Sequence, residues 1–97
     1  MEEGKQMATA TMIVRHQVGD YATWRSVYDS VEGLRQQHGC FGAEVFVDPG
    51  DKQDVFVLHR FPSLEQAQAF VTSDELGQAM GRAGVIGAPR IELTVEP

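Results

Sequence analysis

Three histidines, His16, His38 and His59, are the side chains of this 97-residue chain able to move a proton near neutral pH. His16 and His59 lie at the ends of apolar runs, where each is suited to act as a general base or to orient a phenolic substrate. The alternative for both is a histidine that only hydrogen-bonds its surroundings. His38 ends a helical pattern, and we assign it a structural role at the negative end of the helix dipole.

An aromatic stripe follows His16, because Tyr21, Trp24 and Tyr28 recur at spacings of three and four. Such a stripe usually packs a core, but a buried tyrosine or tryptophan also needs a polar partner. A flat aromatic ligand would fit a pocket between this stripe, His16, Phe70 and either Phe46 or Phe56. We therefore predict two catalytic candidates, His16 and Tyr28. The substrate-binding candidates are Trp24, Tyr21, His59, Phe56 and Phe70.

No metal site or cofactor is predicted. His16 and His59 would be roughly 10 to 14 Å apart on neighbouring strands, too far to share a small ion. Cys40 is the single cysteine, and we expect it to behave as a small hydrophobe. Arg15 and Arg60 each adjoin a histidine and so point to the opposite strand face. They would bind an acidic substrate group or, as we favour, form ion pairs across a dimer.

The composition excludes several classes of protein. A net charge of −6 with scattered basic residues argues against nucleic acid and anionic membranes as partners. No apolar run approaches the roughly 20 residues of a membrane span, and no phosphate-binding glycine motif or nucleophile elbow is present. Residues 1–8 are expected to be a mobile tail without signal-peptide features, with Met7 an alternative start, so we expect a cytoplasmic protein.

The pattern of the chain predicts the elements that position these residues. We expect strands over residues 9–18, 41–47, 55–60 and 90–95, and a turn over 48–51. Asp20 would cap a helix over 21–38 whose solvated side carries Arg25, Asp29, Glu32, Arg35 and Gln36. Ser63 and Gln66 would form a capping box for a second helix, which is interrupted at residues 72–74 and re-capped by Ser73 or Asp74. Residues 81–87 are expected to form a glycine-rich loop.

The resulting order, β-α-β-β-α-β, predicts a single α+β domain over residues 9–97 with the ferredoxin-like fold. Its antiparallel sheet would have the strand order 4-1-3-2, with two helices on one face. The two central strands are apolar on both faces, although the helices cover only one. We therefore expect a homodimer in which two sheets pack face to face.

The residues Val14-Arg15-His16, Asp20-Tyr21-x-x-Trp24 and the segment 83–89 resemble the dimeric α+β barrel superfamily. The nearest branch is that of antibiotic-biosynthesis-monooxygenase-like and small cyclase-like proteins. The resemblance implies a dimer with a pocket between sheet and helices, and it implies no particular chemistry. Relatives of this type include haem-degrading enzymes, but haem degradation is not expected here, because the second predicted helix has no histidine to serve as an axial ligand.

Two hypotheses about function remain open. In the first, the protein is a cofactor-independent enzyme, monooxygenase- or cyclase-like, that acts on a hydrophobic, aromatic or polyketide-like small molecule. In the second, it is a non-catalytic dimer that binds a small ligand or serves as an interaction module, and the aromatic stripe is sealed core. A cavity beside Trp24 and Tyr28, with His16 facing it, would distinguish the two.

Overall fold

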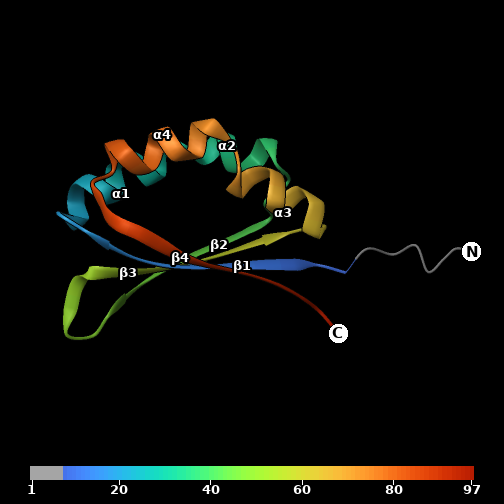
Figure 1. Ribbon diagram of the computed structural model, residues 1–97, viewed down its shortest axis with the longest axis horizontal. Helices are drawn as coiled ribbons and strands as arrows, with labels where there is room; N and C mark the ends of the chain where they lie inside the picture. The colour runs from blue at the N-terminus through green and yellow to red at the C-terminus, as the bar shows by residue number, and fades with distance from the viewer. Residues whose placement is uncertain (1–7) are drawn as a thin grey trace, which may run out of the picture.

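The computed structural model describes residues 8–97, which form four strands and four helices (Figure 1). The strands are β1 (Ala10–Val18), β2 (Gly42–Asp48), β3 (Asp51–Phe61) and β4 (Val85–Val95). The helices are α1 (Tyr21–Ser30), α2 (Glu32–Gln37), α3 (Leu64–Val71) and α4 (Asp74–Arg82).

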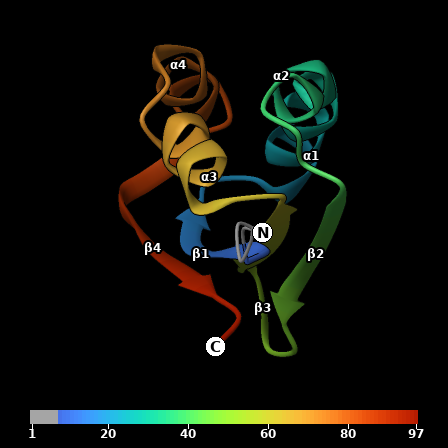
Figure 2. The same cartoon turned by 90° about the vertical axis from the view of Figure 1, so that its right-hand side faces the viewer.

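The four strands form one antiparallel sheet in the order β2-β3-β1-β4, which confirms the predicted topology and the ferredoxin-like fold. All four helices lie over the same face of the sheet, with α1 and α2 beside α3 and α4 (Figure 2). One face of the sheet is therefore covered and the other is open.

The core lies between the helices and the covered face. Residues of β1 alternate between buried and exposed positions, so that Met12, Val14 and His16 all point toward the helices. The register of β1 and β3 places His59 opposite Met12 and thus on the same face. Trp24 and Phe70 complete the core from the two helical pairs.

The first predicted helix is broken, which corrects the expectation of one helix over residues 21–38. Val31 has φ −106° and ψ 23°, outside helical values, and separates α1 from α2. Arg35, predicted to face solvent, is buried with only 7% of its surface exposed. Its spacing of seven residues from Tyr28 and eleven from Trp24 places it on their side of the helical pair rather than on the solvated side.

The predicted caps are present. The carboxylate of Asp20 accepts a hydrogen bond from the Thr23 amide at 2.9 Å at the start of α1. The Ser63 hydroxyl accepts from the amide of Gln66 at the start of α3, and Ser73 re-caps the chain for α4. The predicted break at residues 72–74 is therefore confirmed.

The expectation of a loop over residues 81–87 is wrong. Helix α4 continues to Arg82, and β4 begins at Val85 rather than near Arg90. Gly84, with φ +78°, makes the reversal within two residues of the helix end, a conformation that L side chains rarely adopt. Strand β3 is also longer than predicted, because it starts at Asp51 directly after a two-residue turn.

The sheet contains one irregularity beside His16. Arg15 pairs with Arg90 and Gln17 pairs with Ile86, so three residues of β4 face a single residue of β1. Gly87, with φ +71°, lies in this bulge. The bulge leaves His16 without a partner on β4 in the strand register.

Within residues 8–97, no helix is long and apolar enough to cross a membrane. Apart from residue 8, the predicted tail lies outside the described residues.

Candidate functional site

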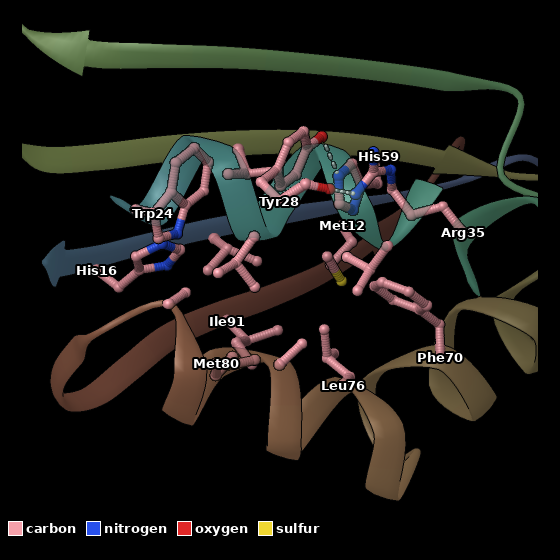
Figure 3. Close-up of a pocket in the computed structure, with 16 residues that line it drawn as sticks. Met12, His16, Trp24, Tyr28, Arg35, His59, Phe70, Leu76, Met80 and Ile91 are labelled. Atoms are coloured by element: carbon pink, nitrogen blue, oxygen red, sulfur yellow. Dashed lines mark hydrogen bonds between the residues drawn. The ribbon is translucent and has the colours of Figure 1, made fainter. Parts of the chain in front are cut away.

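A cavity lies between the covered face of the sheet and the two helical pairs (Figure 3). It has a volume of about 60 Å³, or about 560 Å³ when all the empty space around it, including space open to solvent, is counted. Its walls come from every element except β2, and most of them are apolar. The lining residues central to the site are His16, Trp24, Tyr28, Arg35, His59 and Phe70.

His16 reaches the cavity from the end of β1. Its side chain is 8% exposed, and neither ring nitrogen has a hydrogen-bond partner among residues 8–97. The ring centroid lies 5.6 Å from that of Trp24. Burial lowers the pKa of His16 below its ordinary value, and the nearby Asp54 carboxylate opposes this effect. The neutral imidazole is therefore the favoured form at pH 7, and both of its ring nitrogens are buried beside the cavity.

Tyr28 of α1 and His59 of β3 form a hydrogen-bonded pair in the wall of the cavity. The Tyr28 hydroxyl lies 2.8 Å from Nε2 of His59, and the tautomer of the imidazole decides which atom donates. Burial, together with the smaller effect of the Arg35 cation, lowers the pKa of His59 to about 4. Burial raises the pKa of Tyr28, while Arg35 partly offsets that rise. Both side chains are consequently uncharged near neutral pH.

Arg35 lies at the same end of the cavity as this pair. Its guanidinium donates to the main-chain oxygen of Tyr28 at 2.9 Å and lies 3.9 Å from the centre of the Tyr28 ring. The side chain thus holds α2 against α1 across the break at Val31. It also places a positive charge on the wall of an otherwise apolar cavity.

The aromatic stripe is a continuous stack. The ring of Trp24 lies 5.9 Å from Tyr21 and 4.9 Å from Tyr28, and Tyr28 stacks on His59 at 5.8 Å. Trp24 and Tyr28 line the cavity, whereas Tyr21 supports Trp24 from outside the lining. The stripe is thus both core and cavity wall.

The structure brings five of the seven predicted site residues to the cavity, namely His16, Trp24, Tyr28, His59 and Phe70. Tyr21 contacts the site only through Trp24. Phe56 lies elsewhere, because it pairs with Arg15 and Phe46 on the open face, where the Arg15 guanidinium covers its ring at 5.1 Å. Phe46 is 52% exposed on that face.

The remaining polar candidates have local partners. Arg15 binds the Asp54 carboxylate through two hydrogen bonds of 3.1 and 2.7 Å, which lowers the pKa of Asp54. Arg60 lies 3.6 Å from Glu44. His38 meets Phe70 edge-on at 5.7 Å, and the Cys40 thiol donates to the Gly42 carbonyl at 3.2 Å.

The strand register separates His16 from His59. His16 faces Val55 and His59 faces Met12, four residues along β1, which corresponds to roughly 13 Å. Figure 3 shows His16 near one end of the cavity and His59 with Arg35 at the other. Among residues 8–97, no three His, Cys, Asp or Glu side chains come together as they would to hold a metal ion.

Arg35 is the residue of the site that the sequence reasoning missed. The prediction assigned it to the solvated side of the helix over residues 21–38 because it is charged. Its position eleven residues after Trp24 and seven after Tyr28 nevertheless places it on their face of a helix, and this spacing is the signal that could have found it.

The sequence comparisons agree with the fold. The family model described as antibiotic biosynthesis monooxygenase matches residues 7–82. No curated protein matches the chain. The chain is similar to SnoaB, a cofactor-independent oxygenase from Streptomyces nogalater, with a TM-score of 0.76 and 12% identity over 93% of this chain and 94% of that one.

Two further solved structures share the fold. The chain is similar to a protein described as an antibiotic biosynthesis monooxygenase from Bordetella bronchiseptica, with a TM-score of 0.79 and 12% identity over 94% of this chain and 99% of that one. The chain is also similar to a protein described in the same way from Chloroflexus aurantiacus J-10-fl. The TM-score is 0.69, and the identity is 20% over 93% of this chain and 94% of that one. At these identities the likenesses show the fold, and the family model covers most of the chain. The chain therefore belongs to the antibiotic biosynthesis monooxygenase family.

Proposed function

We propose that this protein is a cofactor-independent monooxygenase that acts on a flat, aromatic or polyketide-like molecule in the cavity between sheet and helices. The observation that carries the proposal is His16, a buried neutral imidazole on an apolar cavity wall, whose ring nitrogens have no partner within residues 8–97. Hydrogen-bonding groups buried without a partner are uncommon and cost free energy, so a free imidazole here is explained by a substrate. The oxygenase similar to this chain, SnoaB, supports the choice of reaction.

In the proposed reaction, His16 removes a proton from an acidic C–H group of the substrate. Burial favours this role, because it keeps His16 neutral at pH 7 and removes competing water. The carbanion formed is delocalised over the ring system, and dioxygen accepts its electrons. One oxygen atom enters the product as a carbonyl and the other leaves as water, so that a ring CH2 and O2 become C=O and H2O.

The other cavity residues orient the substrate. The indole of Trp24 offers a flat surface beside His16. The hydroxyl of Tyr28, which is bonded to His59, would donate to a substrate oxygen in the tautomer in which Nε2 of His59 carries the proton. The cavity of about 60 Å³ is smaller than a tricyclic molecule, so such a substrate would also occupy the adjoining space that is open to solvent.

The test uses an anthrone as substrate, because its central CH2 is acidic and its quinone product absorbs visible light. We expect quinone formation with one O2 consumed per product, a loss of at least tenfold in kcat for His16→Ala, and little change for His38→Ala. Equal rates for wild type and His16→Ala would refute the assignment of His16. Binding of the anthrone without O2 uptake would favour a non-catalytic ligand-binding protein or a cyclase-like activity.

We also propose that the protein is a homodimer formed through the open face of the sheet. On this face Ile13 pairs with Leu58, and Phe56 pairs with Phe46, which gives an apolar stripe across the three strands β1, β3 and β2. Ile13 is 37% and Phe46 is 52% exposed in the single chain. A continuous apolar patch of this kind is typical of an interface.

Light scattering after size exclusion should give twice the chain mass of 10.7 kDa, about 21 kDa. Ile13→Asp should shift the protein toward the monomer. Leu64→Asp is the matched control, because Leu64 is similarly exposed, at 38%, but lies on the helical side. A wild-type monomer at micromolar concentration would contradict the dimer.

A further inference from the structure

We propose that the cavity selects ligands that carry an anionic oxygen, a carboxylate or an enolate, and that Arg35 is the residue that binds it. This inference rests on the proposed ligand cavity but not on the oxygenase reaction. It adds the chemical class of one end of the ligand and the residue that recognises it.

Arg35 is a buried cation to which no carboxylate is bound within residues 8–97. Four other arginines lie within 4 Å of a carboxylate oxygen, in the pairs Arg15–Asp54, Arg25–Asp29, Arg60–Glu44 and Arg90–Glu92. All four are far more exposed than Arg35, whose exposed fraction is 7%. Buried charges are usually paired, because the loss of hydration is otherwise uncompensated.

The contacts of Arg35 leave part of its guanidinium unused. One N–H donates to the main-chain oxygen of Tyr28, and the plane of the group lies against the Tyr28 ring at 3.9 Å. A guanidinium carries five N–H donors arranged as a fork, and no further hydrogen bond of this side chain occurs within residues 8–97. The remaining donors match the two oxygens of a carboxylate, while the existing contacts hold the group in place.

No aspartate or glutamate is among the residues that line the cavity, so no acidic side chain of the lining competes for this position. The acidic group that acts on Tyr28, Asp29, is held by Arg25 at 3.1 Å on the outer side of α1. His59 is uncharged at neutral pH, and the rest of the lining is largely apolar. Arg35 is the one lysine or arginine among the lining residues, so an anion that enters the cavity meets its positive charge, and the low polarity around it strengthens their attraction.

This position would also orient the ligand. Figure 3 shows Arg35 and His16 toward opposite ends of the cavity, with Trp24 beside His16 and Tyr28 between Trp24 and Arg35. A ligand whose anionic oxygen binds Arg35 would lie along the aromatic stack and present its other end to His16. The two polar ends of the cavity thus select both the charge and the direction of the ligand.

The experiment compares two probes of the same shape, 2-naphthoate and 2-naphthamide, by calorimetric titration of the full chain at pH 7. We expect the naphthoate to bind wild type on the order of tenfold more tightly, as charge-assisted hydrogen bonds would require. Arg35→Met should remove this preference and retain binding of the amide. Arg25→Met is the matched control, because it removes the same charge from an exposed guanidinium that also lies over the Tyr28 ring, at 5.6 Å.

Equal affinities of wild type for the two probes, or a preference that persists in Arg35→Met, would overturn the inference and leave the cavity intact. If Arg35→Met does not fold, Arg35→Lys keeps the charge but not the fork and should reduce the preference. Binding of neither probe would refute both this inference and the proposed cavity function. A naphthoate preference alongside full activity of His16→Ala would instead refute only the assigned catalytic role.

Discussion

Replacement of His59 by glutamine should make the stability of the protein less sensitive to acid. His59 is 3% exposed, and its pKa is lowered to about 4 from an ordinary value of 6.5. Between these values the unfolded chain binds a proton that the folded chain does not bind. The free energy of unfolding therefore falls as the pH decreases from 6.5 to 4 and is unaffected by His59 above 7.

The size of this effect follows from the two pKa values. Their difference corresponds to about 3 kcal/mol in the free energy of unfolding once His59 is protonated in both the folded and the unfolded chain. Most of this loss, roughly 2 to 3 kcal/mol, has occurred by pH 4.5. In His59→Gln this contribution is absent, while the amide can still hydrogen-bond the Tyr28 hydroxyl. Between pH 7 and pH 4.5 the free energy of unfolding of wild type should thus fall by about 2 to 3 kcal/mol more than that of the variant.

The assay is urea unfolding followed by circular dichroism, at fixed protein concentration because a dimer makes stability depend on concentration. Measurements above pH 7 serve as the control, because there the difference in the free energy of unfolding between wild type and His59→Gln should not change with pH. Depressed carboxyl groups such as Asp54 also lose stability in acid, but they are common to both proteins and cancel in the comparison. If the free energy of unfolding fell equally with pH in wild type and His59→Gln, His59 would not be held neutral by burial, and the reasoning would be refuted.

Three further outcomes are expected. Tyr28→Phe leaves Nε2 of His59 without its partner at 2.8 Å and should lower the free energy of unfolding by about 1 to 3 kcal/mol, measured by urea unfolding. Trp24→Ala empties the centre of the aromatic stack, and its cost of roughly 3 to 5 kcal/mol should appear as a large drop in Tm; a small drop would contradict the described packing. Gly39→Ala should lower the free energy of unfolding by at least about 1 to 2 kcal/mol, because Gly39 has φ +84° and a Cβ there would meet a side-chain nitrogen at 2.5 Å. Its control, Gly33→Ala in α2, meets nothing within 4 Å and should stabilise the protein by up to about 1 kcal/mol.

The fold could be predicted from the sequence because its signals are local and mutually consistent. The apolar run at residues 12–14 and the caps at Asp20, Ser63 and Ser73 each depend on a few neighbouring residues. The central position of β1 and β3 follows from their apolar character on both faces. These features require no knowledge of tertiary contacts.

The candidate site could be predicted only in part, because some of its features depend on contacts between residues that are distant in the sequence. The pairing of Tyr28 with His59 joins residues 31 positions apart, and it depends on the register of β3 under α1. The inward position of Arg35 is a different case, because its spacing of seven residues from Tyr28 is a local signal that its charge obscured. The early start of β4 depends on the positive φ of Gly84, which a glycine permits but does not require.

The position of Trp24 in the aromatic stack makes its intrinsic fluorescence a probe of the cavity. Trp24 is the single tryptophan of the chain, is 3% exposed, and contacts the rings of His16, Tyr21 and Tyr28. Its emission therefore originates entirely from the wall of the cavity, and a bound aromatic molecule would quench or shift it directly. Occupancy and protonation of the site can thus be followed in the unlabelled protein, with no second tryptophan to contribute background.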